Sequence, residues 1–167
     1  MIFEGKVWKF GDNINTDLIM PVKAVQMYKS QNNPQEIASQ FCMSTNRPGW
    51  AQQVQEGDII IAGTNWGCGS SRPVSRMIKA LGISVIVAES IARLFFRNSI
   101  NIGLPALTCV GIVAAFDEGE IARVNIETGE VHNLSTGIAI QGEALPADSP
   151  PMQILKAGGL SHIKLGT

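Results

Sequence analysis

The sequence predicts an α/β fold with a partly parallel central sheet and a β-rich C-terminal portion, in one domain spanning residues 1–167. The run Ile59–Ala62 and the stretch 83–90 are apolar enough to be strands buried on both faces, as in parallel sheets. A glycine-rich loop and a helical pattern separate them. An alternating stretch over 121–135, with a Thr-Gly turn, predicts a hairpin.

The elements before the glycine-rich loop are less regular. Residues 1–9 read as a first strand. Residues 11–21 are rich in Asn and Asp, which favour loops. Residues 22–33 favour no single element. Residues 33–44 predict a short helix, because asparagine can cap its start and proline suits the first helical position.

The middle of the chain reads as strand, loop, helix, strand and helix over 57–103. The first helix falls in 72–82, with an apolar stripe and Gly82 where a C-terminal glycine would end it. The second falls in 90–103. This order predicts two parallel strands joined by a helix. A last helix over 150–160 begins with prolines and ends with glycines.

Composition narrows the partners of the chain. A net charge of −1 argues against nucleic acid and against an anionic membrane surface. Charged residues make up only 16%, which suggests that part of the surface is covered by a protein partner. The N-terminus resembles no signal peptide, and no apolar run reaches the roughly 18 residues of a transmembrane helix. We therefore expect a cytoplasmic protein.

Cysteines and histidines predict no metal site in this chain. Cys42, Cys68 and Cys109 lie in three separate segments without a CxxC spacing. His132 falls in the hairpin and His162 near the C-terminus, so no Ser-His arrangement is evident.

The loop in "GTNWGCGSSRPVSRMIKALG" suits an anion. Glycines let backbone N–H groups converge, and the following helix adds the positive end of its dipole. Ser70 and Ser71 come shortly before that helix, and Arg72 offers a two-pronged donor for a carboxylate or phosphate. The same residues also allow a simpler interpretation, a capped helix with Ser71 as its N-cap.

Common motifs do not explain this loop. It lacks the Gly-Lys-Ser/Thr of a phosphate-binding P-loop and the glycine spacing of a dinucleotide fingerprint. Ser70 lacks the second flanking glycine of a nucleophile elbow, which disfavours a stand-alone serine hydrolase. A non-catalytic module that binds a carboxylate or phosphate stays open as an alternative to an enzyme.

Three blocks together carry a family resemblance: "GDNINTDLIMP", "GCGSSR" and "ESIARLFFRNSINIGLP". In this order they resemble the small subunit of 3-isopropylmalate dehydratase, the swivelling domain of the aconitase superfamily, over roughly residues 1–165. The resemblance implies a swivelling β/β/α three-layer fold and a role in leucine biosynthesis. It implies a hydro-lyase that isomerises a hydroxy acid.

The resemblance also implies a division of labour. A separate large subunit is expected to hold a [4Fe–4S] cluster on three cysteines, and this chain is expected to bind no cofactor itself. The small subunit closes over the large one and is inactive alone. A homo-oligomer of the isolated chain stays open.

Site roles follow from matching the motifs. Ser70 matches the serine whose alkoxide takes the substrate's α-proton, and Asp17 matches an aspartate that supports the catalytic network. Ser71 and Arg72 match residues that contact substrate, Arg72 through a carboxylate. Two glycines of the loop are expected to let it approach the substrate closely: Gly67 and Gly69.

The sequence departs from the family in two places. The serine-arginine motif is usually followed by Glu-His-Ala, whereas this chain has Pro73, Val74 and Ser75. The stretch that reads the variable part of the substrate also differs, and Lys29 or Lys23 could supply its positive charge. Isopropylmalate, citramalate, dimethylmalate and homoaconitate all stay open as substrates.

Overall fold

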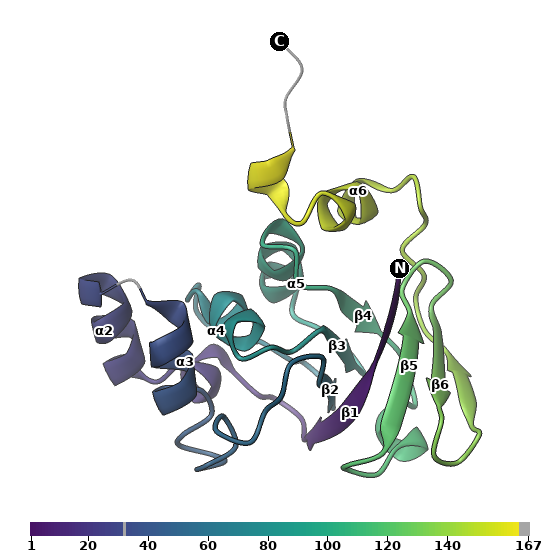
Figure 1. The fold of residues 1–167 in the computed structure, drawn as a ribbon, viewed down its shortest axis with the longest axis horizontal. Coiled ribbons are helices and arrows are strands. Elements are labelled where there is room, and N and C mark those ends of the chain that lie inside the picture. Colours follow the sequence, from purple (N-terminus) through teal and green to yellow (C-terminus); the bar gives the residue numbers. More distant parts are fainter. Residues whose placement is uncertain (32, 164–167) are drawn as a thin grey trace.

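The computed structural model describes residues 1–31 and 33–163, and within them it contains a seven-stranded mixed sheet (Figure 1). The strand order is β4-β3-β2-β1-β5-β6-β7. Neighbours from β4 to β1 are parallel, and neighbours from β1 to β7 are antiparallel. The strands are β1 (Ile2–Phe10), β2 (Ile59–Ala62), β3 (Val85–Ala88), β4 (Ala106–Thr108), β5 (Ile121–Asn125), β6 (Glu130–Asn133) and β7 (Ala139–Gln141).

Strand β1 joins the two halves of the sheet because its two ends have different partners. Its first half, from Ile2 to Lys6, pairs with β5 in antiparallel register. Its second half, from Val7 to Phe10, pairs with β2 in parallel register. The predicted partly parallel α/β fold is therefore confirmed, and so is the 121–135 hairpin as β5 and β6.

The central strands are buried on both faces, as their apolar runs predict. Ile60 and Ile86 belong to a first core, which packs against helices α1 to α4. Ile61 and Val87 belong to a second core, which packs against α6 and the β5–β6 hairpin. Figure 1 shows α2, α3 and α4 grouped to the left of the parallel strands, and the β5–β6 hairpin at the right, where it continues the sheet beyond β1. Each β2 residue is buried, so this strand is a rigid base for the loop that follows it.

The helices include one that the sequence did not predict. They are α1 (Thr16–Ile19), α2 (Val22–Gln31), α3 (Pro34–Phe41), α4 (Val74–Ala80), α5 (Arg93–Asn101) and α6 (Pro150–Lys156), with 3-10 turns η1 (Val113–Ala115) and η2 (Leu160–His162). The stretch expected to be a loop, 11–21, contains α1. The undecided stretch 22–33 forms α2 as far as Gln31, and residue 32 lies outside the described residues.

Helix starts show where capping was predicted well and where it was not. Asn33 caps α3 by accepting a hydrogen bond from the N–H of Glu36, as expected. The alternative with Ser71 as N-cap of α4 is wrong: Pro73 occupies that position, and no side chain caps the helix. Proline's fixed φ suits the entry to a helix without a side-chain acceptor. The serines are thus not engaged as caps.

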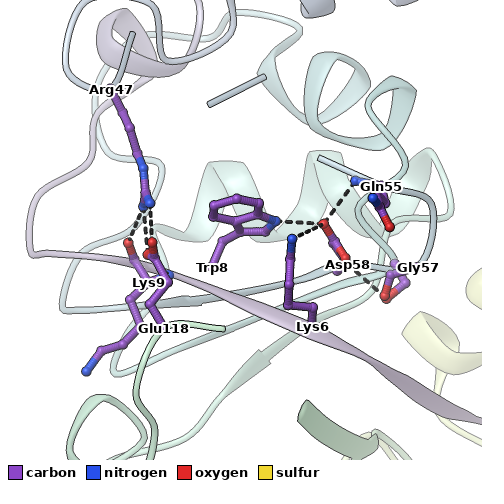
Figure 2. Close-up of polar contacts among 9 residues, drawn as sticks. Lys6, Trp8, Lys9, Arg47, Gln55, Gly57, Asp58 and Glu118 are labelled. Carbon is purple, nitrogen blue, oxygen red and sulfur yellow. Dashed lines mark hydrogen bonds and ion pairs between the residues drawn. The ribbon is translucent and has the colours of Figure 1, made fainter. Parts of the chain in front are cut away.

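Polar contacts fix strand β1, which leads into α1. Asp58 is only 5% exposed and accepts hydrogen bonds from Trp8 Nε1 at 2.7 Å and from the Gln55 N–H at 2.9 Å (Figure 2). Arg47 pairs with Glu118 and donates to the Lys9 carbonyl at 3.0 Å. These contacts anchor the C-terminal end of β1, from which the chain continues to α1. In the described part of the chain, no helix is long and apolar enough to cross a membrane.

Candidate active site

The serine loop, residues 63–73 between β2 and α4, lies directly against the segment that forms α1. The Gly67 N–H donates to the Ile14 carbonyl at 2.8 Å, and the Thr16 N–H donates to the Cys68 carbonyl at 2.8 Å. These bonds form a short parallel bridge between Asn15 and Cys68. Two motifs that are far apart in sequence are thereby held in one unit.

Helix α1 is a single turn, because the hydrogen bonds that start it and end it both lie within residues 15–20. The Asn15 side chain accepts from the Leu18 N–H at 2.9 Å and starts the helix. The Met20 N–H returns to the Thr16 carbonyl at 2.9 Å and closes it. Thr16 and Ile19 are buried against the fold, which leaves the carboxylate between them, Asp17, at the surface.

Arg72 is held by two groups of α1. Its Nη2 lies 3.0 Å from Asp17 Oδ1, and its Nη1 donates to the Met20 carbonyl at 2.8 Å. The Arg72 side chain is 19% exposed, whereas that of Asp17 is 65% exposed. The guanidinium is therefore fixed in place while the remaining donors of its five N–H groups are left for a ligand.

Ser70 lies on the surface of the same loop. Its Oγ is 3.5 Å from Thr16 Oγ1, and the residue is exposed. Among the residues that the structure describes, the backbone N–H groups of 68–72 donate to no protein acceptor. The Gly67 N–H is not available for an anion, because it donates to the Ile14 carbonyl. The exposed Ser70 hydroxyl is open to a ligand.

The two loop glycines meet different requirements. Gly67 has a φ of 73°, and a Cβ there would overlap the ring of Phe95 on α5. Gly69 has a φ of 106°, and a Cβ there would lie 3.1 Å from Thr16 Oγ1. Packing alone thus explains Gly67. The expectation that these glycines bring the loop close to substrate stays a prediction.

A pocket of about 380 Å³ opens between the serine loop, α4 and α5. Its lining includes Ser71 and Arg72 from the loop, Arg76 from α4, and Asn98 and Asn101 from α5. Ser70 lies outside this lining, on the side of the loop that faces α1. Ser71 and Arg72 are thus brought together in one concavity.

The structure does not bring the candidate lysines into this unit. Lys29 is exposed in the last turn of α2, and in the described part of the chain no hydrogen bond or ion pair joins it to the serine loop. Lys23 lies over the ring of Phe41 at 5.5 Å. A substrate role for Lys29 stays a prediction.

The cysteines do not fit an iron–sulfur cluster. Cys42 belongs to the first core and Cys109 to the second, so the sheet separates them, and Cys68 lies in the serine loop. Burial raises the pKa of the Cys42 thiol to about 12. Burial and the nearby charge of Glu89 raise the pKa of Cys109 to about 11. Within residues 1–31 and 33–163, no group of three His, Cys, Asp or Glu could hold a metal.

Comparison with known proteins connects this unit to a family. Residues 5–110 match the model of the aconitase C-terminal domain. The isopropylmalate/citramalate isomerase small subunit of Methanocaldococcus jannaschii is 47% identical over 160 residues, covering 95% of this chain and 91% of the relative. The chain belongs to the family of aconitase C-terminal domains. The 3-isopropylmalate dehydratase small subunit of Heliobacterium modesticaldum is 44% identical over 163 residues, covering 96% and 93% of the two chains.

A solved structure supports the same assignment. The crystal structure of 3-isopropylmalate dehydratase from Methanocaldococcus jannaschii superposes with a TM-score of 0.86 at 36% identity, covering 97% of this chain and 92% of that one. The predicted family and fold are confirmed, and with them the class, a small subunit of an aconitase-like hydro-lyase. Such a subunit has a larger partner.

Two site groups were missed by sequence reasoning. The Thr16 hydroxyl reaches Ser70, and the Met20 carbonyl binds Arg72. The signal for Thr16 was its place beside Asp17 in the Asn-Thr-Asp motif. A backbone carbonyl leaves no such signal.

Proposed function

We propose that this chain supplies the catalytic base and one carboxylate-binding arginine to a hydro-lyase that isomerises a 2-hydroxy dicarboxylic acid, with 3-isopropylmalate and citramalate as substrates. The observation that carries the proposal is the exposed Ser70 on a loop whose Arg72 is fixed by Asp17. The names of the relatives from Methanocaldococcus jannaschii and Heliobacterium modesticaldum support the substrate class.

Ser70 handles the proton. Its alkoxide takes the α-proton and becomes the neutral hydroxyl. The C–H electron pair becomes the new C=C bond while the C–O bond on the neighbouring carbon breaks and its electron pair leaves with hydroxide. Ser70 then returns the proton when water adds in the opposite sense. A serine can be a base only if its negative form is stabilised. Free amides of the serine loop lie on the chain beside it.

Arg72 and Ser71 hold the substrate. A guanidinium fixed by Asp17 and the Met20 carbonyl approaches a carboxylate without first having to be ordered. Ser71 lines a pocket next to Arg72 and can donate to that carboxylate. Ser70 lies outside the lining of this pocket, so a substrate whose α-proton reaches Ser70 must extend beyond it. Asp17 is therefore a positioning residue in this proposal.

The exposure of the site explains why a partner is needed. Ser70 is open to water in this chain, and the high dielectric of water weakens the attraction between an alkoxide and nearby N–H donors or a guanidinium. A large subunit that covers the loop would exclude water and strengthen every charge interaction inside. That subunit would also carry the [4Fe–4S] cluster, which would polarise the departing hydroxyl. The cysteines of this chain do not fit such a cluster.

Reconstitution tests the proposal. The chain would be mixed with a cluster-loaded large subunit from the same source, and the ultraviolet absorbance of the unsaturated acid would be followed with 3-isopropylmalate and with citramalate. We expect turnover from the mixture and none from either part. Tight binding of a carboxylate without turnover, with an active cluster present, would favour the non-catalytic binding module instead.

A further inference from the structure

We propose that Thr16 is a positioning residue for Ser70: its buried hydroxyl orients the serine Oγ and donates a hydrogen bond to it in the deprotonated form. This inference rests on the proposed role of Ser70 as the base. Thr16 lies in one of the blocks that carry the family resemblance, but the resemblance gave it no role, and it is buried.

Thr16 is held firmly enough to orient another side chain. It is 3% exposed, its N–H donates to the Cys68 carbonyl at 2.8 Å, and its carbonyl accepts from the Met20 N–H at 2.9 Å. A β-branched side chain on such a backbone has few rotamers. The Oγ1 position is therefore set by the bridge between α1 and the serine loop.

The Thr16 hydroxyl has one partner. In the described part of the chain, Ser70 Oγ at 3.5 Å is its only hydrogen-bonding contact. Buried hydroxyls are normally paired, so the buried threonine depends on this contact for its hydrogen bond, whereas the exposed serine can also bond to water. The contact is long, as catalytic hydrogen bonds often are before the substrate complex forms.

Ionisation fixes the direction of this hydrogen bond. In the neutral pair either oxygen can donate. Once Ser70 has lost its proton it can only accept, so Thr16 must donate, and a hydrogen bond to a negative oxygen is shorter and stronger. The charged groups of this unit, Arg72 and Asp17, are already tied to each other at 3.0 Å. Thr16 is thus an uncharged donor aimed at the serine oxygen.

Gly69 gives this contact its space. A Cβ at position 69 would lie 3.1 Å from Thr16 Oγ1 and would press on the hydroxyl. Ordinary side-chain contacts are wider than this, so a larger residue would move the threonine or the loop. Besides its φ of 106°, which favours glycine, Gly69 thus leaves room for the Thr16 hydroxyl that contacts Ser70.

The test compares Thr16→Val with Thr16→Ser in the complex with the large subunit. Valine keeps the shape and removes the donor; serine keeps the donor. We expect Thr16→Val to lower kcat by about 10²-fold, the scale of one lost oxyanion donor, with KM within a few fold. Thr16→Ser should stay within a few fold of wild type. A kcat for Thr16→Val within threefold of wild type, or an equal loss in both variants, would overturn the inference.

Controls separate this inference from the proposed function. If Ser70→Ala stays active, the base assignment itself is wrong. If Ser70→Ala is inactive and Thr16→Val is unchanged, only the role of Thr16 is wrong. In the double variant, Thr16→Val should cause no further loss. Assembly would be checked by size-exclusion chromatography, and if the valine variant does not assemble, Thr16→Ala removes the same hydroxyl and is judged by the same criteria.

Discussion

Asp17 and Arg72 form an ion pair of 3.0 Å that ties helix α1 to the serine loop. The pair is unequal: the guanidinium is mostly covered, while the carboxylate faces solvent. Arg72 also donates a hydrogen bond to the Met20 carbonyl, at the other end of the same helix. Arg72 is therefore oriented by α1 as a whole, and the aspartate contributes position more than stability, because exposed ion pairs contribute about 0–1 kcal/mol.

Replacing Asp17 should damage turnover while leaving the fold intact. We expect Asp17→Asn to lower kcat/KM by roughly 10²-fold, the cost of a small misplacement near the chemistry. Thermal unfolding of the isolated chain should change little. The matched control is Glu4→Gln, which breaks an exposed ion pair with Arg123 of 2.9 Å on the sheet. Equal kinetic effects of the two variants would refute the positioning role.

Gly67→Ala should destabilise the chain by about 3 kcal/mol, because the left-handed φ costs about 1–2 kcal/mol and the overlap with Phe95 adds about 1–3 kcal/mol. The control is Gly137→Ala, where φ is 82° and no atom lies within 4 Å of the added Cβ. That variant should lose only the stability that the left-handed backbone conformation costs an alanine. Denaturant unfolding measures both, and similar losses would mean that packing on Phe95 is unimportant.

Asp58→Ala should lower the free energy of unfolding by about 3 kcal/mol, since it leaves the Trp8 Nε1–H and the Gln55 N–H without their acceptor. Trp8→Phe removes only one donor and keeps Asp58 bonded to Gln55 and near Lys6, at 4.0 Å. We expect Trp8→Phe to lose less stability from broken hydrogen bonds than Asp58→Ala. A double-mutant cycle measured by urea unfolding should show coupling between positions 8 and 58, and strict additivity would contradict the contact.

The Glu118 carboxylate should make stability fall at acid pH. A hydrogen bond from Arg47 at 2.9 Å holds the pKa of Glu118 below its usual 4.5, and the Lys9 N–H at 3.0 Å adds to this. A lowered folded-state pKa means that the contribution is present above the unfolded value and is lost as pH falls through the folded one. Glu118→Gln and Arg47→Met should both flatten the decline of the melting temperature below about pH 4.5. An unchanged decline in both would contradict this.

Local patterns predicted most of the fold. The apolar run of Ile59–Ala62 and the cap formed by Asn33 needed only neighbouring residues, and both hold. The double role of β1 could not be predicted, because its partners β2 and β5 are distant in sequence. The extent of a single domain over 1–167 and the cytoplasmic location stay predictions.

The site was predicted by motif and completed by contacts. Asp17, Ser70 and Arg72 were expected to share one site, and their catalytic roles stay predictions. The structure ties Asp17 to Arg72, whereas Ser70 contacts Thr16 and lies outside the pocket that Arg72 lines. Helix α1 was not expected, because four residues give no periodicity and its strongest contacts are with the serine loop. Thr16 was missed for the same reason: its partner lies in another motif.

The most direct measurement is the turnover of Ser70→Ala in the reconstituted complex, beside Ser71→Ala and wild type. Loss of the base should lower kcat by roughly 10²–10⁴-fold, while the variant still binds the large subunit. Ser71→Ala should mainly raise KM, because Ser71 lines the pocket and does not carry the proton. A Ser70→Ala complex that turns over within tenfold of wild type would contradict the account.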